Sequence, residues 1–182
     1  MQSYYTRIRI LVVAALFCTV STLSAHAAGG IETAGDVLTA VLPAAAGGLM
    51  LGHKDVEGAW QFAESTALAL GVTYLLKFTV SEERPNNEDR QSFPSAHTSV
   101  SFSSAEFIRK RYGWEYGIPA YAVASFVAFS RVDSRQHYAH DVIAGAAIGI
   151  ASSYLFTRPY KDWNIKAEAD RGYYGIRVSR AW

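Results

Sequence analysis

Cysteine is almost absent from this chain of 182 residues, which has one, Cys18. A domain without pairs of cysteines forms no disulfides, so the packing of its secondary structure must hold it together. The net charge is also small, at +1. Without a surplus of basic residues there is no indication of a nucleic-acid partner. Composition therefore excludes a disulfide scaffold and disfavours a nucleic-acid-binding domain.

Charge-free segments in the body of the chain are shorter than a typical membrane span. Segments 117–130 and 142–157 carry no charged residue, whereas a spanning helix needs about 20 apolar residues. Half of the residues are hydrophobic, 18% are charged, and the mean hydropathy is +0.05. Tyr and Trp near the expected helix ends resemble an interfacial belt. We predict a membrane-embedded bundle, with a soluble periplasmic domain as the alternative.

Residues 1–27 resemble an export signal. Arg7 and Arg9 precede an apolar run over residues 10–20, and Ala25-His26-Ala27 has small residues at the spacing of a cleavage site. Cleavage there would remove Cys18, and the alternative is an anchor helix that stays attached. The predicted organisation is a signal peptide (1–27), a helical domain (28–160) and a tail (161–182).

Five helices and a terminal β-hairpin are expected after the signal. Apolar segments bounded by proline, glycine or polar turns predict helices over 35–52, 57–80, 95–112, 117–130 and 138–157. Hydrophobic and polar residues then alternate on both sides of Arg171-Gly172, which predicts a hairpin within 161–182. The expected fold class is therefore all-α with a C-terminal hairpin.

Prolines and glycines refine these helices. Pro43 should kink the first helix or shift its start. Pro119 suits the first turn of the fourth helix, where the missing N–H costs nothing. Gly145 and Gly149 lie on a small-residue face of the fifth helix, which permits close contact with a neighbour.

Lys77 and Arg84 lie seven residues apart at the polar end of the second predicted helix. Two fixed cations suit a group with several negative oxygens, because arginine binds such a group bidentately and lysine acts as a point charge. The alternative is a lysine that extends to solvent beside an ordinary surface arginine.

The segment Pro94-Ser95-Ala96-His97 begins the third predicted helix. Ser95 is suited to the N-cap, and the unpaired amides of the first turn form an anion site. His97 lies beside that site and could donate a proton to a leaving oxygen. The alternative is a capped helix with an exposed histidine.

Charged residues gather between Ser130 and Asp141. Arg131 ends the fourth predicted helix, and the four-residue spacing of His137 and Asp141 predicts that both lie on one face of the fifth. A carboxylate bound to one imidazole nitrogen leaves the other nitrogen free to attack. The alternative is an ion pair at a helix start.

Together these three pieces supply cations, an anion site, an acidic histidine and an oriented histidine. Those are the parts needed for in-line phosphoryl transfer through a phosphohistidine. Zinc held by His97, His137, His140 and Asp141 is a conceivable alternative. Three cations at the same place would repel a divalent ion, so we expect a reaction without metal or other cofactor.

The sequence resembles the type 2 phosphatidic acid phosphatase family, which includes bacterial acid phosphatases and shares its core with vanadium haloperoxidases. The family motifs Lys-x6-Arg-Pro, Pro-Ser-x-His and Ser-Arg-x5-His-x3-Asp match at Lys77, at Pro94 and at Ser130, with all spacings kept. One departure is Ala96, where the family usually has glycine, and alanine is tolerable in a first helical turn.

The resemblance implies a role for each matched residue. Phosphate oxygens would be bound by Lys77, Arg84 and Arg131, and Ser95 with the backbone at Ala96 would complete the pocket. The nucleophile would be His137, oriented by Asp141, and the general acid would be His97. The expected protein is a hydrolase of the bacterial cell envelope, facing the periplasm among membrane lipids, that acts on a lipid-linked phosphate monoester or pyrophosphate.

Two other functions stay open. A vanadium-dependent haloperoxidase would use the same pocket for vanadate, although the short chain leaves little room for a halide site. A non-catalytic membrane bundle would keep the pocket for anion binding alone.

Overall fold

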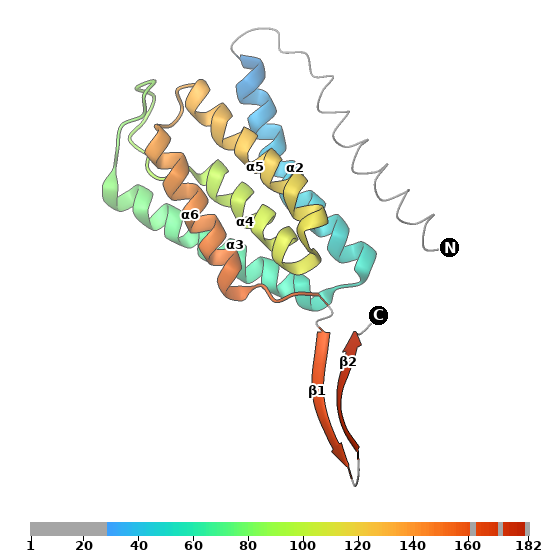
Figure 1. Ribbon diagram of the computed structural model, residues 1–182. Helices are drawn as coiled ribbons and strands as arrows, with labels where there is room; N and C mark the ends of the chain where they lie inside the picture. Colours follow the sequence, from blue (N-terminus) through green and yellow to red (C-terminus); the bar gives the residue numbers. More distant parts are fainter. Residues whose placement is uncertain (1–28, 161–162, 171–172, 181–182) are drawn as a thin grey trace.

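The computed structural model describes residues 29–160, 163–170 and 173–180. Its elements, in chain order, are α2 (Gly29–His53), α3 (Val56–Val80), α4 (Ala96–Tyr112), α5 (Trp114–Asp133), α6 (Ala139–Phe156), β1 (Trp163–Asp170) and β2 (Tyr173–Arg180) (Figure 1). The prediction of a five-helix bundle is confirmed. The predicted signal, with Cys18 and its cleavage site, lies outside the described residues.

The two strands form an antiparallel pair in which Trp163 is opposite Arg180 and Asp170 is opposite Tyr173. The predicted hairpin range, 161–182, extends beyond these strands to positions that the structure does not describe.

Helix α4 is the centre of the bundle, in contact with the other four helices. Its apolar residues Ala105, Phe107 and Ile108 pack with Leu42 of α2 and Ala124 of α5 in one buried cluster. The serines of α4 are buried as well, and Ser99 and Ser103 are hydrogen-bonded to neighbouring helices. Thr73 donates to Ser99 across 3.0 Å, and Ser153 donates to the carbonyl oxygen of Ser103 across 2.7 Å. Hydrogen bonds therefore supplement apolar contacts inside the bundle.

Glycines let α6 lie directly against α4, as the small-residue face predicts. A Cβ atom at Gly145 or Gly149 would overlap backbone atoms of α4, among them the carbonyl oxygens of Ser95 and Ser99. Backbone atoms cannot move aside as a flexible side chain can, so both positions require glycine. This contact fixes the start of α4 relative to the start of α6.

The starts of two helices, α2 and α5, differ from prediction. Helix α2 begins at Gly29 and continues through Pro43, earlier than the predicted start at residue 35. The turn predicted over residues 112–114 is reduced to Gly113, whose φ of +100° suits a glycine. Helix α5 therefore begins at Trp114, and Pro119 lies in its second turn instead of its first. A proline lacks the N–H that would bond the carbonyl oxygen four residues earlier. Near a helix start, this leaves only that one carbonyl oxygen without its helical partner.

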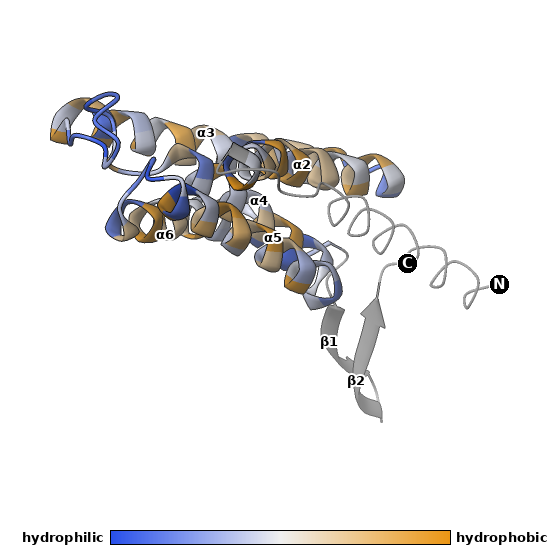
Figure 2. Ribbon diagram, turned by 90° about the horizontal axis from the view of Figure 1, so that it is seen from above, coloured by the Kyte–Doolittle hydropathy of each residue, from blue (hydrophilic) through white to orange (hydrophobic). Residues whose placement is uncertain are grey.

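The outer surface of the bundle carries many large apolar side chains. They occur on all four helices that surround α4 and include Val37, Leu51, Leu75, Phe78, Ile118, Phe129, Ile143 and Leu155. Two helical segments, Gly30–His53 and Ala139–Phe156, are long and apolar enough to cross a membrane by length and composition. Hydrophilic residues instead gather at the end where the α3–α4 and α5–α6 loops lie (Figure 2). Such a surface is compatible with membrane association.

The contact between α4 and α6 predicts that two glycine-to-alanine substitutions differ strongly in their effect on thermal stability. Gly149→Ala should lower the melting temperature, because overpacking of a tight contact costs about 1–3 kcal/mol. Gly71→Ala is the matched control, since Gly71 lies inside α3 with nothing within 4 Å of the added methyl group. It should be neutral or stabilising by about 0.5–1 kcal/mol. Thermal unfolding in detergent would contradict this account if Gly149→Ala melted at or above the wild-type temperature.

Candidate active site

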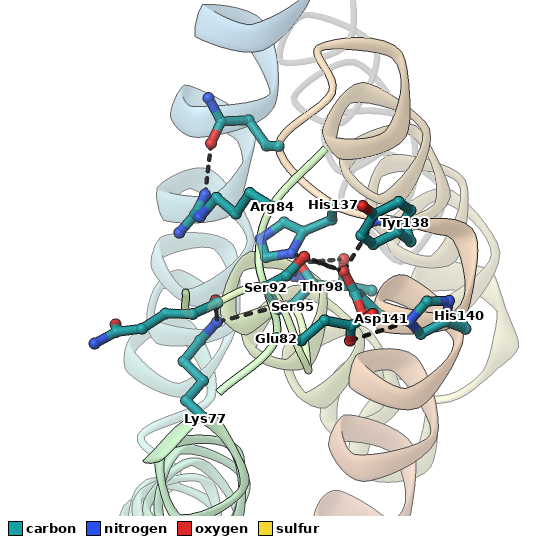
Figure 3. Close-up of polar contacts among 12 residues, drawn as sticks. Lys77, Glu82, Arg84, Ser92, Ser95, Thr98, His137, Tyr138, His140 and Asp141 are labelled. Carbon is teal, nitrogen blue, oxygen red and sulfur yellow. Dashed lines mark hydrogen bonds and ion pairs between the residues drawn. The ribbon is translucent and has the colours of Figure 1, made fainter. Parts of the chain in front are cut away.

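The predicted site residues come together at the polar end of the bundle. They belong to the end of α3, the loop before α4, the first turn of α4, the end of α5, the loop before α6 and the first turn of α6. Figure 3 labels five of them, Lys77, Arg84, Ser95, His137 and Asp141. Segments far apart in the sequence therefore meet around one place, and each is described in turn below.

Lys77 lies in the last turn of α3 and is buried. Its Nζ donates to the carbonyl oxygen of Gln91 at 2.5 Å and to that of Ser92 at 3.4 Å. Burial lowers the pKa of Lys77 to about 8, and the positive charge of Arg84 acts in the same direction. A lysine in this state carries its charge at neutral pH and is poorly solvated, which favours an anionic ligand.

Arg84 lies in the loop that follows α3. Its Nε donates to Asp89 at 2.7 Å, and its Nη1 donates to the side-chain oxygen of Gln136. Gln136 belongs to the loop before α6. Arg84 therefore connects the loop after α3 to the loop before α6 at the rim of the site.

The start of α4 is built as the sequence predicts. Ser95 is the N-cap, and its Oγ accepts a hydrogen bond from the amide of Thr98 at 3.4 Å. Ala96 is the first residue of the helix, so its amide is among those left unpaired by the helix itself. The amide of Ser95 donates to the carbonyl oxygen of Asp141 at 3.1 Å. This bond joins the predicted anion site to the start of α6.

His97 follows in the same turn and is partly exposed. Its Nε2 lies 3.3 Å from Oδ1 of Asp36, a residue of α2. Burial lowers the pKa of His97, and the positive charge of Arg131 lowers it further, whereas Asp36 opposes both. A bound phosphate would act like Asp36 and favour the protonated ring.

Arg131 is buried, and each part of its guanidinium is occupied. Nη1 donates to Asp36 at 2.7 Å, Nη2 to the carbonyl oxygen of Glu32 at 2.6 Å, and Nε to Ser130 at 3.2 Å. Helix α2 comes this close because Gly35 has no side chain, and a Cβ there would overlap Ser130 and Arg131. The carboxylate of Asp36 thus bridges Arg131 and His97.

His137 and Asp141 approach each other, but not in the predicted way. Helix α6 begins at Ala139, so His137 precedes the helix and the two side chains do not share a helix face. The helix starts late because the carboxylate of Asp141 accepts the amide of Tyr138 at 2.9 Å, as an N-terminal capping group does. His137 Nδ1 nevertheless lies 3.4 Å from Asp141 Oδ2.

The surroundings of the His137 ring favour its neutral form. It is buried, and burial lowers the pKa of the imidazole, with Asp141 opposing and Lys77 and Arg84 adding to the shift. Nδ1 forms no hydrogen bond within the described part of the chain. Because an ordinary histidine titrates near pH 6.5, the lowered pKa leaves this ring uncharged at neutral pH. A neutral ring is the form that can act as a nucleophile.

Four residues of this region were not predicted from the sequence. They are Ser92, which donates to Asp141 Oδ2, and the rim residues Glu32, Asp36 and Gln136. Ser92 belongs to a polar loop that gives no local signal. Asp36 does give one, because it is the single charge in the otherwise uncharged stretch 35–52.

The zinc set considered from the sequence is not the one that the structure brings together. Among the described residues, the group with donor atoms within 4.8 Å of one another consists of Glu82, His140 and Asp141. His97 and His137 are not part of this group.

A model of the PAP2 superfamily matches residues 58–165. The chain belongs to the PAP2 superfamily. The lipid A 4'-phosphatase of Helicobacter pylori is 32% identical over 170 residues, which cover 84% of this PAP2 chain and 85% of that protein. The lipid A 1-phosphatase of Porphyromonas gingivalis is 33% identical over 134 residues, covering 68% of this chain and 30% of that protein.

The PAP2 fold is also found among solved structures. The crystal structure of LpxE from Aquifex aeolicus matches with a TM-score of 0.58 at 19% identity, over 78% of this chain and 92% of that one. The predicted family is confirmed, and so is the predicted enzyme class, a phosphatase among the hydrolases.

The bridge through Asp36 predicts how the site responds to an anion. If phosphate binds Arg131 as predicted, it must displace this carboxylate, so Asp36→Asn should tighten the binding of inorganic phosphate. We expect a gain of about fivefold, because a half-exposed charge pair contributes up to about 1 kcal/mol. Isothermal titration in detergent measures this, with the exposed Asp133→Asn as control. Unchanged or weaker binding by Asp36→Asn would contradict the displacement.

Proposed function

We propose that this PAP2 chain removes a phosphate group from a membrane lipid through a phosphohistidine intermediate at His137. One observation carries the proposal: two histidines from separate segments lie with Lys77, Arg84 and Arg131 at one end of the bundle. The positive charge of Arg131 lowers the pKa of His97, and those of Lys77 and Arg84 lower the pKa of His137. The two histidines and the three cations are therefore close enough to act on one bound phosphate group.

Phosphate recognition comes first in the proposed reaction. Arg131 exchanges Asp36 for a phosphate oxygen, while Lys77 and Arg84 turn from their present acceptors to the remaining oxygens. Ser95 and the first amides of α4 donate hydrogen bonds to the same phosphate oxygens. Cations and helix amides that surround the equatorial oxygens stabilise the charge of the transition state.

Transfer to the histidine follows. The second nitrogen of His137, Nε2, forms a bond to phosphorus while the phosphorus–oxygen bond of the substrate breaks. His97 gives its proton to the leaving oxygen. The imidazole becomes positively charged, and Asp141, 3.4 Å from Nδ1, stabilises that charge.

Hydrolysis completes the cycle. His97, now neutral, accepts a proton from a water molecule, whose oxygen attacks phosphorus. The phosphorus–nitrogen bond breaks, and His137 and His97 return to their initial states. Each step uses side chains of this chain, and we propose no metal or other cofactor for it.

The proposed substrate is a phosphorylated glycolipid of the lipid A class. Both relatives reported above carry lipid A in their names, and the first is similar along most of its length. The apolar side chains around the bundle would keep the enzyme at the bilayer, where such a substrate resides. Export by residues 1–27, with residues 28–160 as the enzyme and 161–182 as a tail, would place the site at the periplasmic face of the cell envelope.

The proposed function predicts the outcome of a phosphate-release assay with EDTA present. Wild-type protein should hydrolyse lipid A in preference to phosphatidate, phosphatidylglycerol phosphate, polyprenyl pyrophosphate and a soluble aryl phosphate. His137→Ala should lower turnover by at least about a thousandfold, and His97→Ala by about 10²–10⁴-fold, the usual contribution of an acid catalyst. His53→Gln, at the other end of α2, is the control.

Different results would count against different parts of the proposal. Activity retained by His137→Ala would rule out the phosphohistidine. Loss of activity with EDTA would indicate a catalytic metal. A preference for phosphatidate over lipid A would leave the mechanism in place and overturn the substrate.

A further inference from the structure

A second group of ligating side chains lies beside the candidate active site, on the far side of Asp141 from His137. It consists of Glu82, from the loop after α3, His140, from the first turn of α6, and Asp141 (Figure 3). His140 Nε2 is 3.0 Å and 3.2 Å from the two carboxylate oxygens of Glu82 and 3.1 Å from Oδ1 of Asp141. The PAP2 motifs assign no role to Glu82 or His140.

The two oxygens of Asp141 differ in their partners. Oδ2 accepts hydrogen bonds from Ser92 and from the amide of Tyr138 and faces His137. Oδ1 is buried and lies in ion-pair contact with His140 Nε2, but it forms no hydrogen bond in the part of the chain that the structure describes. A buried carboxylate oxygen without a hydrogen bond is costly. It points into the group formed with Glu82 and His140, so a ligand there would satisfy it.

The other two ligands are held in place before any ion binds. The His140 ring stacks on Tyr138, with centroids 5.4 Å apart and planes at 8°, and it also lies 6.1 Å from the Phe93 ring. The carbonyl oxygen of Glu82 accepts the amide of Ser92 at 2.9 Å. Ring contacts and the hydrogen bonds between Nε2 and the Glu82 carboxylate thus place both groups beside Asp141, which reduces the ordering that a ligand must impose.

One imidazole and two carboxylates are a common donor set for Zn²⁺. In tetrahedral coordination at about 2.1 Å, donor atoms lie roughly 3.4 Å apart. The distances from His140 Nε2 to its neighbours are close to that spacing. The two carboxylates would neutralise the ion, and a fourth position would stay open to water.

We propose that Glu82, His140 and Asp141 bind a divalent transition-metal ion of the Zn²⁺ type, and that this ion inhibits the phosphatase. Inhibition follows because Asp141 serves both sites. An ion on Oδ1 withdraws negative charge from the carboxylate that stabilises His137 when the ring becomes positive. The inhibitory part rests on the proposed function, whereas the binding part does not.

Zinc binding is tested directly by isothermal titration of the untagged full chain in detergent. The wild type should bind one Zn²⁺ per chain, and Glu82→Gln and His140→Ala should each weaken binding by at least about tenfold, the cost of losing even a supporting partner of a metal site. Glu83→Gln is the matched control, since Glu83 is exposed and not part of the group. No binding, or equal binding by the wild type and both variants, would overturn the site.

Phosphate release with increasing Zn²⁺ tests the coupling, each variant being compared with its own rate in the absence of zinc. Zinc should inhibit the wild type and Glu83→Gln, and Glu82→Gln should need at least about tenfold more zinc for the same inhibition. Equal zinc sensitivity of Glu82→Gln and the wild type would overturn the coupling. If the chain released no phosphate from any substrate, the proposed function would fail, and the titration would still decide whether the site exists.

Discussion

The buried carboxylate of Asp141 is the contact on which the candidate site depends. A charged group without solvent is tolerated only where several partners compensate it. Here the hydroxyl of Ser92 and the amide of Tyr138 donate to one oxygen, and the backbone carbonyl accepts the amide of Ser95. One residue therefore fixes the loop before α4, the start of α4 and the start of α6. Those are the segments that carry the anion site and His137.

The packing of the helices supports this arrangement. Glycines at 145 and 149 let the backbone of α6 lie on that of α4, while hydrogen bonds such as Thr73 to Ser99 hold the interior. Many large apolar side chains lie on the outside of the four surrounding helices, in addition to the buried cluster around Phe107. Small and hydroxylated residues at the helix contacts, with many apolar residues outside, are the distribution expected of helices that pack in or against a lipid phase.

The sequence predicted the elements well and the contacts between distant segments poorly. Helix positions follow from apolar segments and their Pro, Gly and Ser boundaries, and motif spacing alone selected Lys77, Arg84 and His137. The contact of Arg131 with Asp36 joins residues 95 positions apart, and that of Ser92 with Asp141 joins residues 49 apart. No local pattern contains such pairs, because they arise from packing of the whole bundle. The prediction that His137 and Asp141 share a helix face was wrong for a local reason, because the carboxylate of Asp141 caps the amide of Tyr138 and α6 begins after His137.

The central claim is that the phosphoryl group passes through His137, and trapping the intermediate tests it most directly. The enzyme would be mixed rapidly with an aryl phosphate, whose good leaving group favours accumulation, and denatured in base, where phosphohistidine survives. Mass spectrometry of the digested chain should then find the phosphoryl group on His137, and no such adduct in the His137→Ala protein. A phosphoryl group on His97, or turnover with no phosphorylated histidine at any mixing time, would contradict the account.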